Sequence, residues 1–119
     1  MPQRRNNIFG KNGENIACEL LVKSNYKIID RNFHSRFGEI DIVAIDGDTL
    51  VFVEVKTRQS LRFGLPQEAV TPQKIAKIKK TGEYYSLIHT DLPKKLRVDV
   101  VATIVENGTV TYSKIIKVY

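Results

Sequence analysis

The chain has 119 residues, of which 42% are hydrophobic and 27% charged, so its length and composition predict one globular domain rather than a disordered segment. Its formal net charge of +6 favours a polyanionic partner, with nucleic acid ahead of a membrane surface. The one cysteine, Cys18, excludes an internal disulfide and a cysteine-rich zinc site. Because no apolar run reaches the roughly 18 residues of a membrane span and the N-terminus lacks a secretory signal, we expect a cytoplasmic protein without membrane contact.

The N-terminal part predicts a tail followed by a helix. Residues 1–9 are polar, include Arg4 and Arg5 and show no periodicity, which predicts a flexible basic tail. The single domain should then span residues 10–119. Between residues 10 and 25, apolar side chains recur at the spacing of one face of an amphipathic helix.

Three strands are expected next. Residues 26–33 are rich in strand-forming side chains, and residues 39–45 and 49–57 flank the tight-turn sequence Asp46-Gly47-Asp48, which predicts a hairpin. Residues 59–70 contain Gly64 and Pro66 and predict a loop of about a dozen residues, a length typical of functional or mobile loops.

The C-terminal part predicts a helix and a second hairpin. Thr71-Pro72 provides a helix cap and a proline at the first helical position, and helical spacing continues to about residue 88. Strands are expected at 96–105 and 109–118, joined by Asn107-Gly108. The order α-β-β-β-α-β-β predicts an α/β fold with one mixed sheet, in which the second helix is a right-handed crossover between parallel third and fourth strands.

Two acids of the first hairpin are expected to meet. With Gly47-Asp48 as a two-residue loop, Asp41 lies directly opposite Glu54; with Asp46-Gly47 as the loop, the two are diagonal but on the same face. Two opposed carboxylates destabilise a strand pair unless a cation compensates them, and an oxygen-preferring ion such as Mg²⁺ would do so. Lys56 lies on the same face and could position a water or a phosphate.

The alternative interpretation of these charges is structural. Lys56 would then neutralise Glu39 and Glu54 in exposed ion pairs, each contributing about 0–1 kcal/mol. Glu-x-Lys alone is a common accidental pattern, so the hairpin register and the basic composition carry most of the argument for a site.

An ordered set of blocks gives the chain a specific resemblance. "GKNGENIACELL", "DRNFHSRFGEID", "FVEVKTR", "FGLPQEAVTPQKIAKI" and "LRVDVVA", between residues 10 and 102, resemble the bacterial YraN-like family of endonuclease-like proteins. That family is similar to the PD-(D/E)XK nucleases, whose restriction-endonuclease-like fold includes archaeal Holliday-junction resolvases. Ile40 stands where the superfamily has its proline, as is usual in the resolvase-like branch.

The resemblance assigns roles to particular residues. It implies that Asp41 and Glu54 are catalytic metal ligands for Mg²⁺, or for Mn²⁺ in its place, and that Lys56 positions or activates the attacking water. The acidic residue of the family's first helix falls on Glu14, which would be a further metal ligand. A glutamate in the first turn of a helix is also favourable against the helix dipole without any site.

Basic residues around the acids are candidates for binding DNA. Arg36 and Arg58 flank the carboxylates in sequence and could offset their repulsion of a phosphate backbone, as could Arg62 with less support. Lys74 lies at the edge of the apolar stripe of the second helix, from which it could reach the charged end of the hairpin. Lys77, Lys79 and Lys80 are expected to solvate the exposed face of that helix.

Three functions remain open at this point. The first is a Mg²⁺-dependent endonuclease that hydrolyses DNA phosphodiester bonds at branched or damaged structures. A junction-resolving activity would need two active sites and therefore a homodimer. The second is a non-catalytic nucleic-acid-binding module on the same fold, and the third is a structural or adaptor domain. Retention of Asp41, Glu54 and Lys56 together favours the first, because a pure binder gains nothing from acids that face phosphate.

Overall fold

The computed structural model describes residues 2–118 and gives an α/β fold with a five-stranded mixed sheet and two long helices. None of the helices in that range has the length and apolar character needed to cross a membrane. In chain order the elements are α1 (Pro2–Lys23), β1 (Lys27–Ser35), β2 (Gly38–Asp46), β3 (Thr49–Arg58), the 3-10 helix η1 (Pro66–Ala69), α2 (Pro72–Ile88), β4 (Lys95–Glu106) and β5 (Thr109–Lys117).

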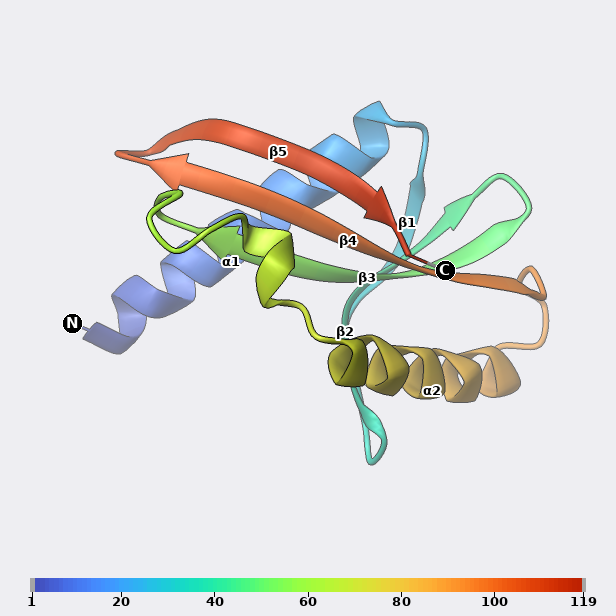
Figure 1. Ribbon diagram of the computed structural model, residues 1–119. Coiled ribbons are helices and arrows are strands. Elements are labelled where there is room, and N and C mark those ends of the chain that lie inside the picture. Colours follow the sequence, from blue (N-terminus) through green and yellow to red (C-terminus); the bar gives the residue numbers. More distant parts are fainter. Residues whose placement is uncertain (1, 119) are drawn as a thin grey trace.

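The strands lie side by side in sequence order, β1-β2-β3-β4-β5 (Figure 1). All neighbouring pairs are antiparallel except β3 and β4, which are parallel and are connected through η1 and α2. The expected element order and the parallel third and fourth strands are therefore confirmed. The short η1 lies inside the segment that the sequence predicted as a loop.

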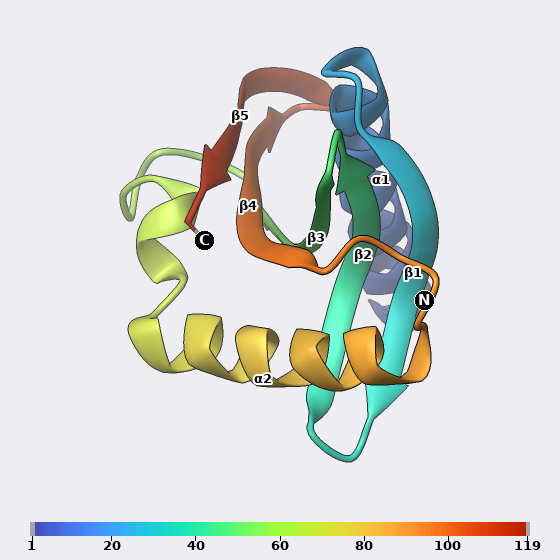
Figure 2. The ribbon, with the colours of Figure 1, turned by 90° about the vertical axis from the view of Figure 1, so that its right-hand side faces the viewer.

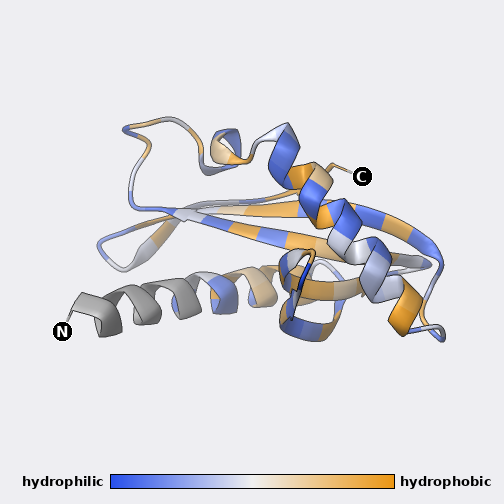
Figure 3. Ribbon diagram, turned by 90° about the horizontal axis from the view of Figure 1, so that it is seen from below, coloured by the Kyte–Doolittle hydropathy of each residue, from blue (hydrophilic) through white to orange (hydrophobic). Residues whose placement is uncertain are grey.

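The two helices cover opposite faces of the sheet, and each face has its own apolar core (Figure 3). Ala17 and Leu21 of α1 pack on Ile42, Val51 and Val53. On the other face, Ile78 and Tyr85 of α2 pack on a second group of buried side chains, Ile40, Val43, Leu50, Phe52 and Val98. The hairpin of β1 and β2 extends past α2, so its turn projects beyond the helix (Figure 2).

The first helix is longer than the sequence indicated. Residues 2–9, expected as a flexible tail, have helical backbone continuous with the rest of α1. The physical reason is that Pro2 suits the first turn of a helix and that extending an existing helix is much easier than starting one. The amphipathic pattern that sequence reasoning used covers only the half of the helix that packs on the sheet.

Local signals place the remaining elements. The Thr71 hydroxyl accepts a hydrogen bond from the Lys74 N–H at 3.1 Å, which caps α2 as predicted. Gly47 has a φ of +62° in the β2–β3 turn, and Asn107 and Gly108 have φ of +51° and +78° in the β4–β5 turn. These left-handed conformations are the ones that tight hairpin turns require, so both predicted hairpins are confirmed.

A buried polar network connects distant parts of the sheet. The Tyr26 hydroxyl donates to Asp99 Oδ2 at 2.6 Å, and Arg97 Nε donates to Asp99 Oδ1 at 2.7 Å. Arg97 Nη2 also donates to Asp46 Oδ2 at 2.7 Å. Asp99 is fully buried, and these donors provide the compensation that a buried carboxylate needs.

Candidate functional site

The two acids of the first hairpin lie where β2 and β3 separate. Paired residues include Ile42 with Val53 and Asp46 with Thr49, so the register is the one with Gly47-Asp48 as the loop. Hydrogen-bonded pairing ends at Ile42 and Val53, one position before Asp41 and Glu54. Beyond that point β2 continues to pair only with β1, and β3 continues to pair with β4. The acids therefore occupy a fork in the sheet.

The Asp41 side chain bridges this fork. Its Oδ2 accepts a hydrogen bond from the Val55 N–H at 2.8 Å, in place of a backbone carbonyl of β2. The alternation of β2 is broken at the same residue, because Ile40 packs against α2 whereas Ile42 packs against α1. In a regular strand, alternation would place these two isoleucines on one face. The separation of the strands is what turns Asp41 inward between them.

Glu54 lies beside Asp41 in a largely buried position, with its side chain only 14% exposed. Burial, the charge of Asp41 and a hydrogen bond to the Asp41 carboxyl group raise the pKa of Glu54 to about 7. Lys74 and Lys56 act in the opposite direction but do not cancel the effect. The two carboxyl groups are thus close enough to repel each other strongly.

Among the ion pairs of the described side chains, the one that involves this pair of acids is formed by Lys74. Its Nζ lies 3.7 Å from Glu54 Oε2, so the side chain reaches from α2 to the fork, as its place on the helix suggested. Lys56 follows Glu54 on the same side of β3, because the intervening Val55 packs with the α1 core. It forms no ion pair with Glu39 or Glu54; among the described side chains, Glu39 is paired with His34 at 3.2 Å instead. The structural alternative for Lys56 is therefore not observed.

Glu14 does not join the two acids. Its Oε1 accepts hydrogen bonds from Arg31 Nη2 at 3.3 Å and from Asn32 Nδ2 at 3.1 Å. No group of three or more metal-ligating side chains is present within the described residues. On β1, Arg31 pairs with Ile42 and Phe33 pairs with Ile40, so Asn32 lies across from Asp41. Glu14 therefore contacts the strand next to Asp41 rather than Asp41 itself.

The two candidate arginines differ in their exposure to solvent. Arg36 is exposed in the turn between β1 and β2, with its guanidinium 5.0 Å above the Phe37 ring. Arg58 is half-buried at the end of β3, and its Nε is buried without a hydrogen-bond partner in the described part of the chain. Arg36 is therefore the more accessible of the two to a large ligand.

Comparison with known proteins identifies the family. Residues 13–103 match the uncharacterised protein family UPF0102. A UPF0102 protein of Syntrophomonas wolfei is 45% identical over 114 residues, which cover 96% of this chain and 99% of the relative. The chain belongs to the UPF0102 family. UPF0102 proteins of Caldicellulosiruptor bescii and Persephonella marina are 47% and 44% identical, over 91% and 84% of this chain and 92% and 86% of their own lengths.

This is the family that the YraN-like resemblance indicated. The region matched to UPF0102 begins at Gly13 and ends at Thr103 and omits β5. It contains the candidate acids and lysines of the site, which are Glu14, Asp41, Glu54, Lys56 and Lys74. The part of the fold that carries the fork is thus the part that defines the family match.

One feature of this UPF0102 chain was not expected from the sequence. Lys77 is exposed, as predicted, but it also lines a pocket of about 370 Å³ together with Lys74 and Arg36. We call this the basic pocket; its other lining residues are Ser35, Gly38, Glu39 and Ile78. The signal was available, since residues three apart on a helix are neighbours and Lys77 is three residues after Lys74.

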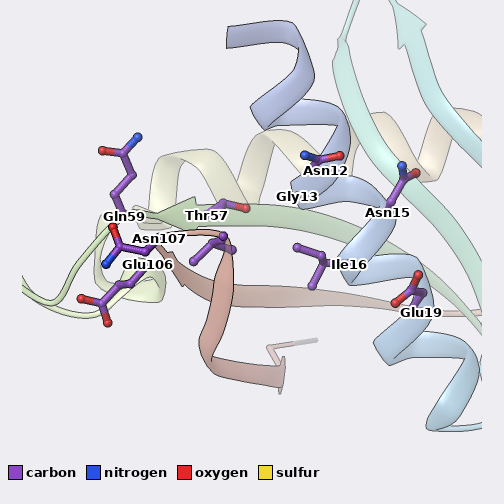
Figure 4. Close-up of a pocket in the computed structure, with 11 residues that line it drawn as sticks. Asn12, Gly13, Asn15, Ile16, Glu19, Thr57, Gln59, Glu106 and Asn107 are labelled. Carbon is purple, nitrogen blue, oxygen red and sulfur yellow. The ribbon is translucent and has the colours of Figure 1, made fainter. Parts of the chain in front are cut away.

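A larger cavity of about 760 Å³ lies on the α1 face (Figure 4). Asn12 and Asn15 of α1 border it together with Thr57 of β3 and Asn107 of the β4–β5 turn. The described side chains that line it include no lysine or arginine, and its two charged groups are the carboxylates of Glu19 and Glu106. This chemistry does not suit a phosphate backbone.

Proposed function

We propose that this UPF0102 protein is a Mg²⁺-dependent endonuclease with a restriction-endonuclease-like fold, which hydrolyses DNA phosphodiester bonds at branched or damaged structures. The observation that carries the proposal is the contact between the Asp41 and Glu54 carboxyl groups in the fork between β2 and β3. The parallel pairing of β3 and β4 and the helix on each face are in keeping with that fold.

The donor atoms of this pair suit a divalent cation. Mg²⁺ prefers carboxylate oxygens, is commonly held by one or two of them, and completes its shell with waters and substrate phosphates. One oxygen of Asp41 accepts a hydrogen bond from the Val55 N–H, which fixes the orientation of the carboxylate. Burial and, after it, the charge of Asp41 raise the pKa of Glu54, and the neighbouring lysines do not cancel these effects. A bound cation would remove the repulsion between the two carboxylates.

Each residue of the fork has a distinct role in this proposal. Asp41 and Glu54 hold the cation, and Lys74 keeps the Glu54 carboxylate in place through its 3.7 Å contact. Lys56 orients the attacking water or steadies the scissile phosphate with its positive charge. When bound, Mg²⁺ would polarise the phosphate and make water a stronger nucleophile at neutral pH.

The proposal is tested by cleavage of labelled duplex, flapped and four-way-junction DNA with Mg²⁺ or Mn²⁺. We expect metal-dependent cleavage that falls about 100-fold or more in Asp41→Ala and in Lys56→Ala, since each removes a charge that acts directly on the reaction. Asp48→Ala is the matched control, because Asp48 is an exposed acid at the opposite end of the same hairpin. Its activity should equal that of the wild type.

Two results would contradict the proposal. Cleavage that survives both Asp41→Ala and Lys56→Ala would show that the reaction occurs elsewhere. A complete absence of cleavage on every substrate, together with salt-sensitive DNA binding that improves in Asp41→Ala, would favour a non-catalytic DNA-binding module. The binding module is the second candidate function, because the described residues form no metal-ligating group of three or more side chains.

A further inference from the structure

The basic pocket is formed between two elements that are distant in sequence. Arg36 lies in the β1–β2 turn and Gly38 begins β2, whereas Lys74 and Lys77 come from the first half of α2. The volume of about 370 Å³ is enough for a phosphate group and part of a sugar. The pocket therefore gathers exposed cationic side chains from two elements at one place on the surface.

Its charge suits an anion. Three of the lining side chains are cationic and one, Glu39, is acidic. Glu39 is 68% exposed and its Oε1 lies 3.2 Å from His34 Nδ1, so its charge is turned toward a partner outside the pocket lining. The balance left in the pocket is positive, which favours a phosphate.

Gly38 holds the pocket in shape. Its φ of +148° is accessible mainly to glycine, and a Cβ there would lie 2.9 Å from Thr81 Oγ1 and 3.2 Å from Lys77 Cε. The missing side chain thus allows the stem of Lys77 to lie directly against the turn. This contact places the stem of Lys77 at the pocket, while the residue remains exposed on its helix face as predicted.

Lys74 connects the pocket to the two acids. It lines the pocket, and its Nζ is also the group 3.7 Å from Glu54 Oε2. An extended polyanion that reaches the fork could therefore continue into the pocket along the same face. The cavity on the α1 face does not suit an extended polyanion, because its described lining carries carboxylates and amides but no cation.

We propose that the basic pocket binds a backbone phosphate of the DNA strand adjacent to the scissile phosphate, which a cation bound by Asp41 and Glu54 would contact. This rests on the proposed function and specifies its substrate: the strand must extend at least one phosphate beyond the scissile bond toward the β1–β2 turn. Lys77 is then a binding residue, and the preferred substrate is a polynucleotide rather than a dinucleotide or a phosphomonoester.

The test is DNA binding by fluorescence anisotropy over a salt series, with a labelled single-stranded oligonucleotide and a chelator present so that no cleavage occurs. We expect Lys77→Ala to weaken binding about threefold or more and to lower the salt slope by about 0.7, since one phosphate contact with a single strand is lost. Lys77→Arg should retain most of the affinity. Lys79→Ala is the matched control, because Lys79 lies on the same helix but lines cavities with Val98, Val100 and Ile116 instead.

The outcomes separate this inference from the proposed function. Equal losses in Lys77→Ala and Lys79→Ala would overturn the phosphate subsite, while Mn²⁺ binding by the same variants, measured by calorimetry, reports separately on the two acids. A selective loss in Lys77→Ala would support the subsite even if Mn²⁺ did not bind, and the nuclease proposal alone would then fail. A dinucleotide that competes as well as a longer strand would also overturn the inference.

Discussion

Glu54 occupies a position where an ionised carboxylate is unfavourable. Its side chain is largely buried, and Asp41 adds a second negative charge beside it. Folded proteins retain such arrangements mainly at functional sites, where a ligand supplies the missing compensation. At the scale of single residues, the fork is therefore less stable than it could be, and substitutions should reveal this.

Replacing Glu54 should stabilise the metal-free protein in a pH-dependent way. The folded pKa of about 7 exceeds the ordinary value of 4.5, so the folded state binds more protons between those pH values and the free energy of unfolding falls as pH rises through them. Glu54→Gln removes this cost. With a chelator present, urea denaturation at about pH 8 should show a gain on the order of 2–3 kcal/mol, and at about pH 4 no comparable gain.

The control for this change is Glu39→Gln. Glu39 lies on β2 with a side chain that is 68% exposed, so its replacement should alter stability by about 0.5 kcal/mol or less at either pH. A Glu54→Gln protein no more stable than the wild type at pH 8 would mean that the carboxylate is not strained by its surroundings.

Two substitutions of Asp41 separate its charge from its hydrogen bond. Asp41→Asn keeps an oxygen that can accept from the Val55 N–H, whereas Asp41→Ala leaves that donor without a partner in the fork. Asp41→Ala should therefore be about 1 kcal/mol less stable than Asp41→Asn in denaturant unfolding, because an unsatisfied donor carries a desolvation cost. Equal stability of the two variants would indicate that water satisfies Val55 in either case.

At the scale of elements, the position of α2 decides where Lys74 and Lys77 can reach. Gly82 lies against Phe52 of β3, and a Cβ at this position would overlap the Phe52 ring. In an exposed helix, Gly→Ala is favourable by about 0.5–1 kcal/mol. Here the contact sets how closely the helix approaches the sheet.

Gly82→Ala should therefore destabilise the fold by about 1–3 kcal/mol and also weaken DNA binding, because α2 must shift away from β3. Thermal unfolding and the anisotropy assay measure the two effects. Glu83→Ala, at the neighbouring exposed position, should change stability by no more than about 0.5 kcal/mol. Stabilisation by Gly82→Ala would show that the sheet accommodates the extra methyl group.

Elements of this fold could be predicted where the signal was local. The Thr71 cap, the Gly47 turn and the Gly108 turn each depend on a few neighbouring residues, and all three were found in place. The register that follows from the first turn is confirmed up to Ile42 and Val53; Asp41 and Glu54 still lie close together, although the strands no longer pair there. The family was also recognisable from its ordered blocks.

The remaining features depend on contacts between distant segments. The end of the β2–β3 ladder and the reversal at Ile40 arise from how each strand pairs with its other neighbour, which alternation in one hairpin cannot show. The role of Lys77 depends on the β1–β2 turn lying beside α2. The contacts of Glu14 with Arg31 and Asn32 likewise join α1 to β1 in a way that helix propensity does not predict.

At the scale of the whole molecule, the Tyr26, Arg97 and Asp99 network joins the residue before β1 to β4 across more than 70 residues of sequence. Burial and the hydrogen bond to Asp99 raise the pKa of Tyr26, so its hydroxyl remains a donor throughout the ordinary pH range. The network lies at the Asp46 end of the hairpin, opposite the fork.

Tyr26→Phe should lower the free energy of unfolding by about 1.5–3 kcal/mol, since it removes a hydrogen bond to a buried carboxylate. Tyr84→Phe is the control, because the Tyr84 hydroxyl forms no hydrogen bond with the described side chains or backbone. Metal binding should be unchanged in both variants. A loss of metal binding in Tyr26→Phe would show that the two ends of the sheet are coupled.

The most direct test of the central claim is calorimetric titration of Mn²⁺ into the wild type, Asp41→Asn, Glu54→Gln and the control Asp48→Asn. If Asp41 and Glu54 hold the ion together, the wild type and Asp48→Asn will bind it at one site with equal affinity, and the other two variants will bind at least about 10-fold more weakly. Equal Mn²⁺ affinity in all four proteins would contradict the claim that these two acids form a metal site.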